Sequence, residues 1–144
     1  MTKNDIIEPL RTLKKAEYTN LKYTHSEITS KIISCCLEIH SFFAPGLLES
    51  IYEDALTREF EIQDIAFERQ KSIELNYKGR IIGNHRIDFL VEDEVVVELK
   101  AVEAINNIYL AQLITYLKVM DKRVGLLINF NVEKLQKGIK RIIL

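Results

Sequence analysis

The stretch "RIDFLVEDEVVVELKA", residues 86–101, holds two apolar segments separated by three acidic residues. Each segment has the composition of a buried strand, and Glu92 and Asp93 form a tight connection, so the stretch predicts an antiparallel hairpin. Near the end of the second strand, Glu98 and Lys100 point to the same face, because strand side chains alternate. Removing charge from water is unfavourable, so these two charges require partners. Either they neutralise each other as an ion pair, or they are held there for chemistry.

Regular patterns continue on both sides of this hairpin. Residues 66–77 alternate apolar and polar side chains, and the Lys-Gly pair at 78–79 is typical of a turn, which extends the prediction to a three-stranded antiparallel meander. Downstream, residues 104–121 have helical spacing. The segment "RVGLLINF", residues 123–130, is almost continuously apolar, which is typical of a central strand covered on both faces. The tail "KGIKRIIL", residues 137–144, is compatible with a last edge strand.

Two helices are predicted ahead of the strands. A capping-box signature at Thr24 opens the first, which runs to an "APG" break at residues 44–46. The second covers about residues 46–62 and has one broad apolar face. We therefore expect a polar N-terminal extension, residues 1–23, followed by one α/β domain, residues 24–144. Its order is α-α-β-β-β-α-β, with a small mixed sheet flanked by helices.

Composition excludes several classes of protein. The chain has 144 residues, 47% hydrophobic and 28% charged, with a formal net charge of −1. These values suit one globular domain and argue against a protein that coats nucleic acid non-specifically. No apolar run approaches the ~18 residues of a membrane span, and the apolar core of a signal peptide is absent. Cys35 and Cys36 are adjacent and lack a CxxC or Cys/His cluster, so we expect buried thiols in a reducing cytoplasm. The absence of HExxH, P-loop and glycine-rich fingerprints argues against zinc proteases, ATPases and dehydrogenases.

Three acidic residues lie where the surrounding helix or strand is apolar: Glu49, Asp88 and Glu98. The hairpin brings Asp88 and Glu98 nearly opposite one another, and Glu49 borders the buried face of its helix. Three converging carboxylates repel one another unless a cation lies between them, and Mg²⁺ prefers such oxygen ligands. Lys100 could then orient or deprotonate the attacking water, or hold a phosphate oxygen. Taken singly, each acid has a simpler explanation: Glu49 as a solvated helix residue, Asp88 as a turn cap, and Glu98 as the partner of Lys100.

Taken together, these blocks resemble a known group of proteins. "RIDFLVEDEVVVELKA" followed by "AQLITYL" resembles the PD-(D/E)XK nuclease superfamily, whose core is α-β-β-β-α-β with a catalytic Asp, an E-x-K and a following helix. Gln112 and Tyr116 have the Gln-x-x-x-Tyr spacing of its RecB-like and lambda-exonuclease-like branch. "GLLESIYEDAL" is similar to the GxxExxY family, whose name-giving residues are here Gly46, Glu49 and Tyr52. The resemblance covers about residues 25–144 and implies a single restriction-endonuclease-like domain.

The resemblance also implies a role for each matched residue. The metal ligands would be Glu49, Asp88, Glu98 and the backbone carbonyl of Leu99. Lys100 would be the catalytic lysine, acting with Asp88 and Glu98. Gln112 would brace Lys100 or contact DNA. Tyr52 would support Glu49 or pack at the cleft, and Tyr116 would support the site from the same helical face as Gln112. Arg86 shares a face with Asp88 if the strand alternates regularly, and it could hold a phosphate, or form a salt bridge to Asp88 or Glu98.

The expected function is Mg²⁺-dependent hydrolysis of phosphodiester bonds in nucleic acid, with Mn²⁺ as the alternative ion and DNA favoured over RNA. The alternative function is a non-catalytic nuclease-fold module that binds nucleic acid or a protein partner. The presence of every expected polar residue favours the enzyme. No recognition element is visible, so we expect low sequence specificity, with a recruiting protein or a homo-oligomer as further partners. Two groups of basic side chains could track a nucleic-acid backbone or form an ordinary solvated surface: Lys118, Lys122, Arg123, and Lys134, Lys137, Lys140, Arg141.

Overall fold

The computed structural model describes residues 25–144. They form the helices α3 (His25–Phe43), α4 (Glu49–Ile62) and α5 (Asn107–Met120), with a short 3-10 helix, η2 (Leu135–Gly138). The strands are β1 (Phe67–Tyr77), β2 (Arg80–Val91), β3 (Val95–Lys100), β4 (Val124–Asn129) and β5 (Ile139–Ile143). The extension predicted for residues 1–23 and the capping box at Thr24 lie outside the described residues.

The five strands form one mixed sheet in the order β1-β2-β3-β4-β5. β1, β2 and β3 are an antiparallel meander, β3 and β4 are parallel, and β5 returns antiparallel to β4. The predicted meander is therefore confirmed. The continuously apolar strand is also confirmed as central, since β4 pairs on both sides and all its residues are buried. β5 supplies the edge strand expected from the tail.

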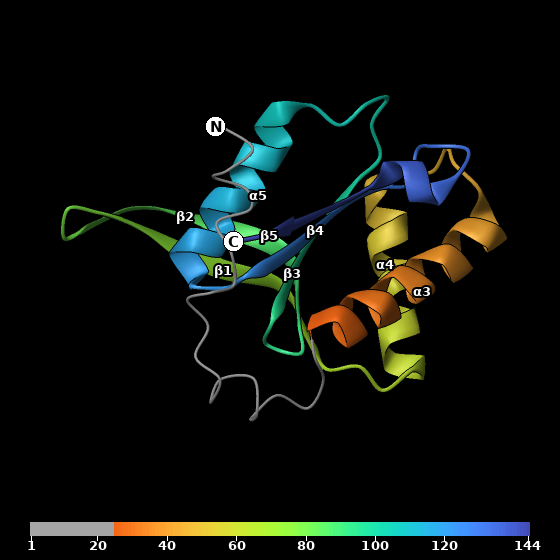
Figure 1. The fold of residues 1–144 in the computed structure, drawn as a ribbon, viewed down its shortest axis with the longest axis horizontal. Coiled ribbons are helices and arrows are strands. Elements are labelled where there is room, and N and C mark those ends of the chain that lie inside the picture. The colour runs from red at the N-terminus through yellow and green to blue at the C-terminus, as the bar shows by residue number, and fades with distance from the viewer. Residues whose placement is uncertain (1–24) are drawn as a thin grey trace.

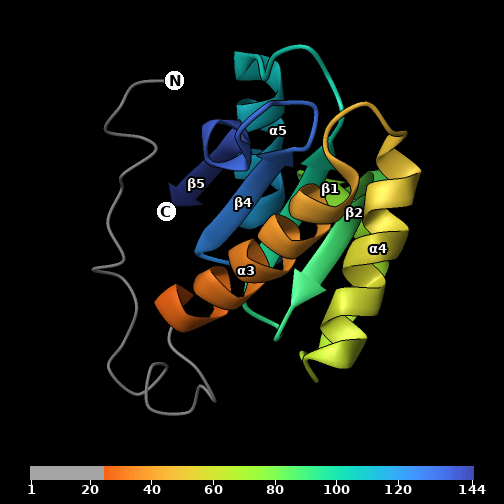
Figure 2. The same ribbon diagram turned by 90° about the vertical axis from the view of Figure 1, so that its right-hand side faces the viewer.

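Helices cover both faces of the sheet, as predicted for an α/β domain. Figure 2 shows α3 and α4 in front of the sheet and α5 behind it, and Figure 1 shows the same layers from the side. Each face has its own apolar core: Phe60, Phe89 and Phe130 belong to the core under α3 and α4, and Leu113 and Leu117 to the core under α5. No helix within residues 25–144 is both long enough and apolar enough to cross a bilayer.

Both predicted turns contain residues with positive φ, a conformation that glycine adopts readily and that lysine and glutamate adopt seldom. Lys78 and Gly79 both have positive φ, 49° and 84°, and join β1 to β2 through a two-residue hairpin turn. Glu92 and Asp93 also have positive φ, 52° and 55°, between β2 and β3. Both connections therefore lie where the sequence predicts them.

The helix that carries Glu49 begins later than predicted. The sequence suggested a start near Gly46, whereas α4 begins at Glu49. Ala44 and Gly46 have φ values of 60° and 110°, which no helical residue adopts, so these residues form a turn ahead of the helix. Similarly, α5 begins at Asn107 rather than 104, because the side chain of Asn106 accepts hydrogen bonds from the first-turn amides and caps the helix.

Simple alternation fails in the middle of β2. Ile87 packs in the core under α5, whereas Phe89, two residues later, packs in the core under α3 and α4. The neighbouring strand changes face at the same level, where Gln70 has a φ of 52°. Asp88 therefore lies at the residue where the hairpin switches its buried face. Regular alternation would place Arg86 on the same face as Asp88, but alternation does not hold in this segment.

Candidate active site

Asp88 and Glu98 occupy an opening between two strands. The β2–β3 ladder pairs Val91 with Val95 and ends at Phe89 and Val97. At the next position the backbone N–H of Asp88 donates to Oε1 of Glu98 at 3.3 Å, and the N–H of Leu99 donates to Oδ2 of Asp88 at 2.8 Å. Carboxylate oxygens thus replace the carbonyl partners that a continued ladder would supply. The two acids lie side by side, as the predicted hairpin requires.

The acid pair lacks a compensating cation in contact. Both side chains are buried, and no ion pair joins either one to Lys100 within residues 25–144. Burial, and then the charge of Asp88, raises the pKa of Glu98 from 4.5 to about 8. Burial also raises the pKa of Asp88, although the hydrogen bond from Leu99 opposes this change. The simple explanation of Glu98 and Lys100 as a neutralising ion pair is therefore wrong for this structure.

Glu49 lies near the acid pair on α4, in the helical layer that α4 forms with α3. It is the first residue of α4 and is half-buried. Burial raises the pKa of Glu49, the charge of Asp88 raises it further, and the charge of Lys100 lowers it. Glu49 also contributes to the raised pKa of Glu98. The helix acid and the two strand acids are thus close enough to interact electrostatically, with Lys100 beside them.

Tyr52 holds the turn that precedes Glu49. Its hydroxyl donates to the carbonyl of Ala44 at 2.7 Å and accepts from the N–H of Leu47 at 3.2 Å. Its ring is fully buried and stacks on Phe130, with 4.4 Å between ring centroids. Since the turn sets where α4 begins, Tyr52 fixes the position of Glu49 indirectly, through the backbone.

A fourth acid and a glutamine, both missed by the sequence analysis, connect α4 to Asp88. Glu53 lies one turn after Glu49 and is buried. The side-chain amide of Gln70 donates to Oε1 of Glu53 at 2.7 Å and to Oδ1 of Asp88 at 3.2 Å. Arg69 also donates to Glu53, at 3.0 Å. The sequence signal available for Glu53 was its spacing of four residues from Glu49. Nothing in the alternating pattern of β1 singled out Gln70.

Lys100 contacts an aromatic ring rather than the predicted glutamine. Its ammonium lies 4.7 Å from the centroid of Tyr109, on the first turn of α5. Gln112 is exposed and makes no side-chain hydrogen bond in the described part of the chain. The bracing of Lys100 by Gln112 is therefore absent here, and its contact with DNA stays a prediction.

Tyr116 lies beside the acid pair on the α5 face of the sheet. Burial raises the pKa of Tyr116, and the charges of Glu98 and Asp88 raise it further. Its hydroxyl is 2.6 Å from Nε2 of His85, and the two rings stack with centroids 4.4 Å apart. Arg86, by contrast, is exposed and forms no ion pair with either acid within residues 25–144. Its predicted role on a phosphate stays a prediction.

The donor chemistry suits a hard divalent cation, because the cluster offers carboxylate oxygens and no thiol or imidazole. Burial raises the pKa values of Glu49, Asp88 and Glu98, and the charges of neighbouring acids raise them further, so a bound cation would stabilise their ionised forms. However, residues 25–144 contain no group of three His, Cys, Asp or Glu side chains already arranged to hold a metal ion. Of the three predicted side-chain ligands, Asp88 and Glu98 lie next to each other. Glu49 is close enough to interact with them electrostatically, but the three carboxylates do not point at one common position.

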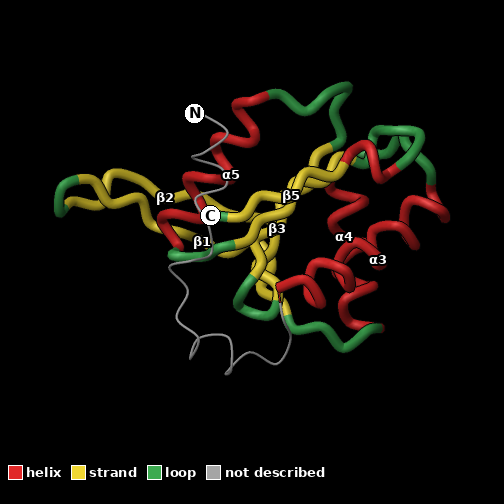
Figure 3. Tube along the Cα trace, in the orientation of Figure 1, coloured by secondary structure: helices red, strands yellow, loops and turns green. Residues whose placement is uncertain are grey.

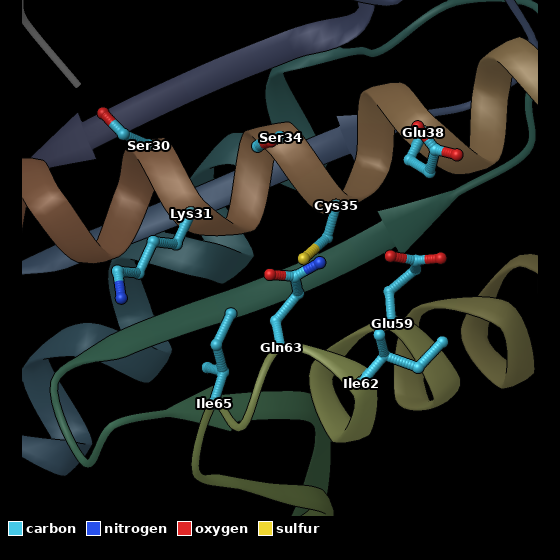
Figure 4. Close-up of a pocket in the computed structure, with 9 residues that line it drawn as sticks. All are labelled: Ser30, Lys31, Ser34, Cys35, Glu38, Glu59, Ile62, Gln63 and Ile65. Atoms are coloured by element: carbon cyan, nitrogen blue, oxygen red, sulfur yellow. The ribbon is translucent and has the colours of Figure 1, made fainter.

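A separate pocket lies between α3 and α4. It has a volume of about 650 Å³, and Figure 4 shows Cys35, Glu38, Glu59 and Gln63 among the side chains that line it. Burial raises the pKa of Cys35 to about 11, so this thiol stays protonated at neutral pH and is a poor nucleophile. Cys35 and Cys36 are both free and buried, as predicted. None of the predicted site residues lines this pocket.

Comparison with known proteins agrees with this geometry. A search of curated proteins finds no significant match. The family model of the PD-(D/E)XK nuclease superfamily matches residues 26–142, which include the four strands β1 to β4, α4 and α5, and all but one terminal residue of α3 and of β5. The match spans most of the chain and all of its acid cluster. The chain therefore belongs to the PD-(D/E)XK nuclease superfamily.

Proposed function

We propose that this protein is a divalent-cation-dependent nuclease that hydrolyses phosphodiester bonds in DNA. Nucleases of its superfamily generally use divalent metal ions, and membership suggests nucleic-acid binding. The observation that carries the proposal is the acid pair Asp88 and Glu98 in the strand opening, with Lys100 on the same strand and Glu49 within electrostatic reach.

We assign the cation, Mg²⁺ or Mn²⁺, to Glu49, Asp88, Glu98 and the backbone carbonyl of Leu99. A bound divalent cation would neutralise phosphate charge and lower the pKa of a coordinated water. Lys100 would hold a phosphate oxygen or orient the attacking water. Its contact with Tyr109 is of a kind worth roughly 0.5–2 kcal/mol, depending on exposure, so it would not prevent Lys100 from turning to a phosphate.

Within the superfamily, we infer a place in the GxxExxY family and in the RecB-like branch. Support comes from the three name-giving residues, which act together in the turn before α4. Gly46 takes a φ of 110°, a conformation that favours glycine; Tyr52 bonds the turn; and Glu49 begins the helix. The free thiols Cys35 and Cys36 are compatible with the reducing cytoplasm, where we propose that the protein acts.

A cleavage assay tests the proposal. The wild-type chain is incubated with single- and double-stranded DNA and RNA in Mg²⁺, Mn²⁺ or chelator. We expect metal-dependent cleavage of DNA and a loss of at least about 100-fold in Lys100→Ala and Asp88→Asn. The exposed matched variants Arg58→Ala and Asp121→Asn should retain activity. If the wild type cleaves none of these substrates and calorimetry detects no metal binding, the enzyme proposal is abandoned.

The second candidate is a non-catalytic module of nuclease fold that binds nucleic acid, a recruiting protein or a second copy of itself. The observation in its favour is that the three acids do not converge as metal ligands in the described residues. Exposed apolar side chains beside the start of α4, Phe42 and Leu48 among them, would suit a protein partner. DNA binding that is unaffected by divalent cations, with no cleavage in any of them, would support this candidate over the first.

A further inference from the structure

The hairpin formed by β1 and β2 extends well beyond the rest of the sheet. β2 pairs with β3 only at residues 89–91, so the paired residues between 80 and 87 pair with β1 alone. Figures 1 and 3 show this two-stranded ribbon projecting from the domain, on the side away from α3 and α4. Ile73 packs in the core under α5 and anchors the ribbon at its base. Residues 71–87 of this hairpin, called the arm below, therefore project from the domain and are held at their base by the core.

The arm carries an excess of positive charge, although the chain as a whole does not. The chain as a whole has a net charge of −1. Residues 71–87 contain one carboxylate, Glu74, against four basic side chains: Lys71, Lys78, Arg80 and Arg86. Lys71 is paired with Glu68 at 2.8 Å. The other three are exposed and have no ion-pair partner anywhere in residues 25–144, so their charges are open to an anionic ligand.

The tip of the arm is apolar. Tyr77, Ile81 and Ile82 are 59%, 54% and 64% exposed. The register of the hairpin shifts at Asn76, which pairs with Ile81, while Leu75 pairs with Gly83. Ile82 is thus a bulged residue without a partner across the ribbon, and the bulge allows two successive isoleucines to be exposed together. Three large apolar side chains exposed together at the end of a basic ribbon form a surface suited to interaction.

We propose that this arm, residues 71–87, binds duplex DNA. A two-stranded ribbon fits a groove of the duplex, exposed cations contact phosphates, and apolar side chains can wedge against base steps. This inference rests on the proposed function, because β2 carries both the arm and Asp88. From Ile82 to Asp88 the strand spans roughly 20 Å at 3.3 Å per residue, about half a helical turn of B-DNA. The arm would contact phosphates and fit the shape of the groove, and contacts of this kind give little sequence specificity.

Binding of the full chain to a labelled DNA duplex tests the charges of the arm. Anisotropy titrations over a range of salt concentrations are made in chelator and again in Ca²⁺, so that cleavage plays no part. Lys78→Ala/Arg80→Ala should weaken binding roughly tenfold at low salt and reduce the slope of log affinity against log salt by about two. The control Lys31→Ala/Arg58→Ala removes equal charge from α3 and α4, on the side of the domain away from the arm, and should leave both quantities unchanged. Equal losses in the two double variants, or none in the first, would overturn the proposal.

A second double variant tests the tip. Ile81→Ser/Ile82→Ser should weaken duplex binding roughly tenfold with no change in the salt slope, because no phosphate contact is lost. Both residues are exposed, so circular dichroism and the melting temperature should match wild type. If these substitutions change the sedimentation coefficient and leave duplex binding intact, the tip is a protein interface and the proposal is wrong. Binding is measured without cleavage. If the arm binds DNA but the chain cleaves none, only the proposed nuclease activity is refuted, and the proposed role of the arm stands.

Discussion

Glu98 gives a quantitative test of the acid cluster, because its pKa in the folded protein lies far from its ordinary value. Burial and the charge of Asp88 raise this pKa from 4.5 to about 8. Between these pH values the folded protein keeps a proton that the unfolded chain releases. The free energy of unfolding of the metal-free protein should therefore fall as the pH rises from 4.5 to about 8.

The size of this effect follows from the same shift. One pKa unit corresponds to ~1.4 kcal/mol, so ionised Glu98 should destabilise the metal-free fold by on the order of 4 kcal/mol near pH 8. Glu98→Gln removes the charge and keeps an oxygen that can accept from the N–H of Asp88. The variant should be more stable than wild type by a few kcal/mol near pH 8 and no more stable below pH 4.5.

Urea denaturation followed by circular dichroism over this pH range measures the difference. Comparing the variant with wild type at each pH removes the contribution of titrating groups that do not interact with Glu98. The exposed residue Glu74 provides the control, and Glu74→Gln should change stability by less than about 0.5 kcal/mol at every pH. A difference between Glu98→Gln and wild type that is zero or independent of pH would refute the assignment of Glu98 to a buried, uncompensated acid cluster.

Three further substitutions test how the fold supports the site. Tyr52→Phe removes two hydrogen bonds from the turn before α4 and should lower the free energy of unfolding by about 1–2 kcal/mol in denaturation experiments. Gln70→Ala leaves a carboxylate oxygen of Asp88 without its amide partner; we expect a loss of about 1–3 kcal/mol and weaker metal binding by calorimetry, and unchanged values would contradict the bridge. Gly138→Ala would bring a β-carbon into the backbone carbonyl of Asn129, so we expect a lower melting temperature, whereas a neutral result would mean that this close approach is absent.

The sequence determined the parts of the site that depend on local pattern. A hairpin whose three connecting residues are 92–94 pairs Val91 with Val95 and so places Asp88 opposite Glu98, because the register follows from the length of the turn. Likewise, the continuous apolar run of β4 identifies a strand with neighbours on both sides. These features need only the two-residue period of a strand and the conformational preferences of turns.

Contacts between layers could not be read from the sequence. The bridge from Glu53 through Gln70 to Asp88 joins α4 to two strands, and it depends on the switch of face in the hairpin. A strict alternating pattern assumes a regular strand and so misassigned the face of the residues before Asp88. The contact of Lys100 with Tyr109 instead of Gln112 has the same origin, since helical spacing fixes a shared face but not which residue meets a strand end.

The central feature of the proposed site is a common cation bound by acids from α4, β2 and β3. Mn²⁺ binding, followed by isothermal calorimetry with Mg²⁺ as competitor, tests it directly on wild type, Glu49→Gln, Asp88→Asn and the exposed control Asp121→Asn. We predict that wild type and the control bind Mn²⁺ and that both site variants lose most of this binding. Equal binding in all four proteins, or none in wild type, would contradict the account.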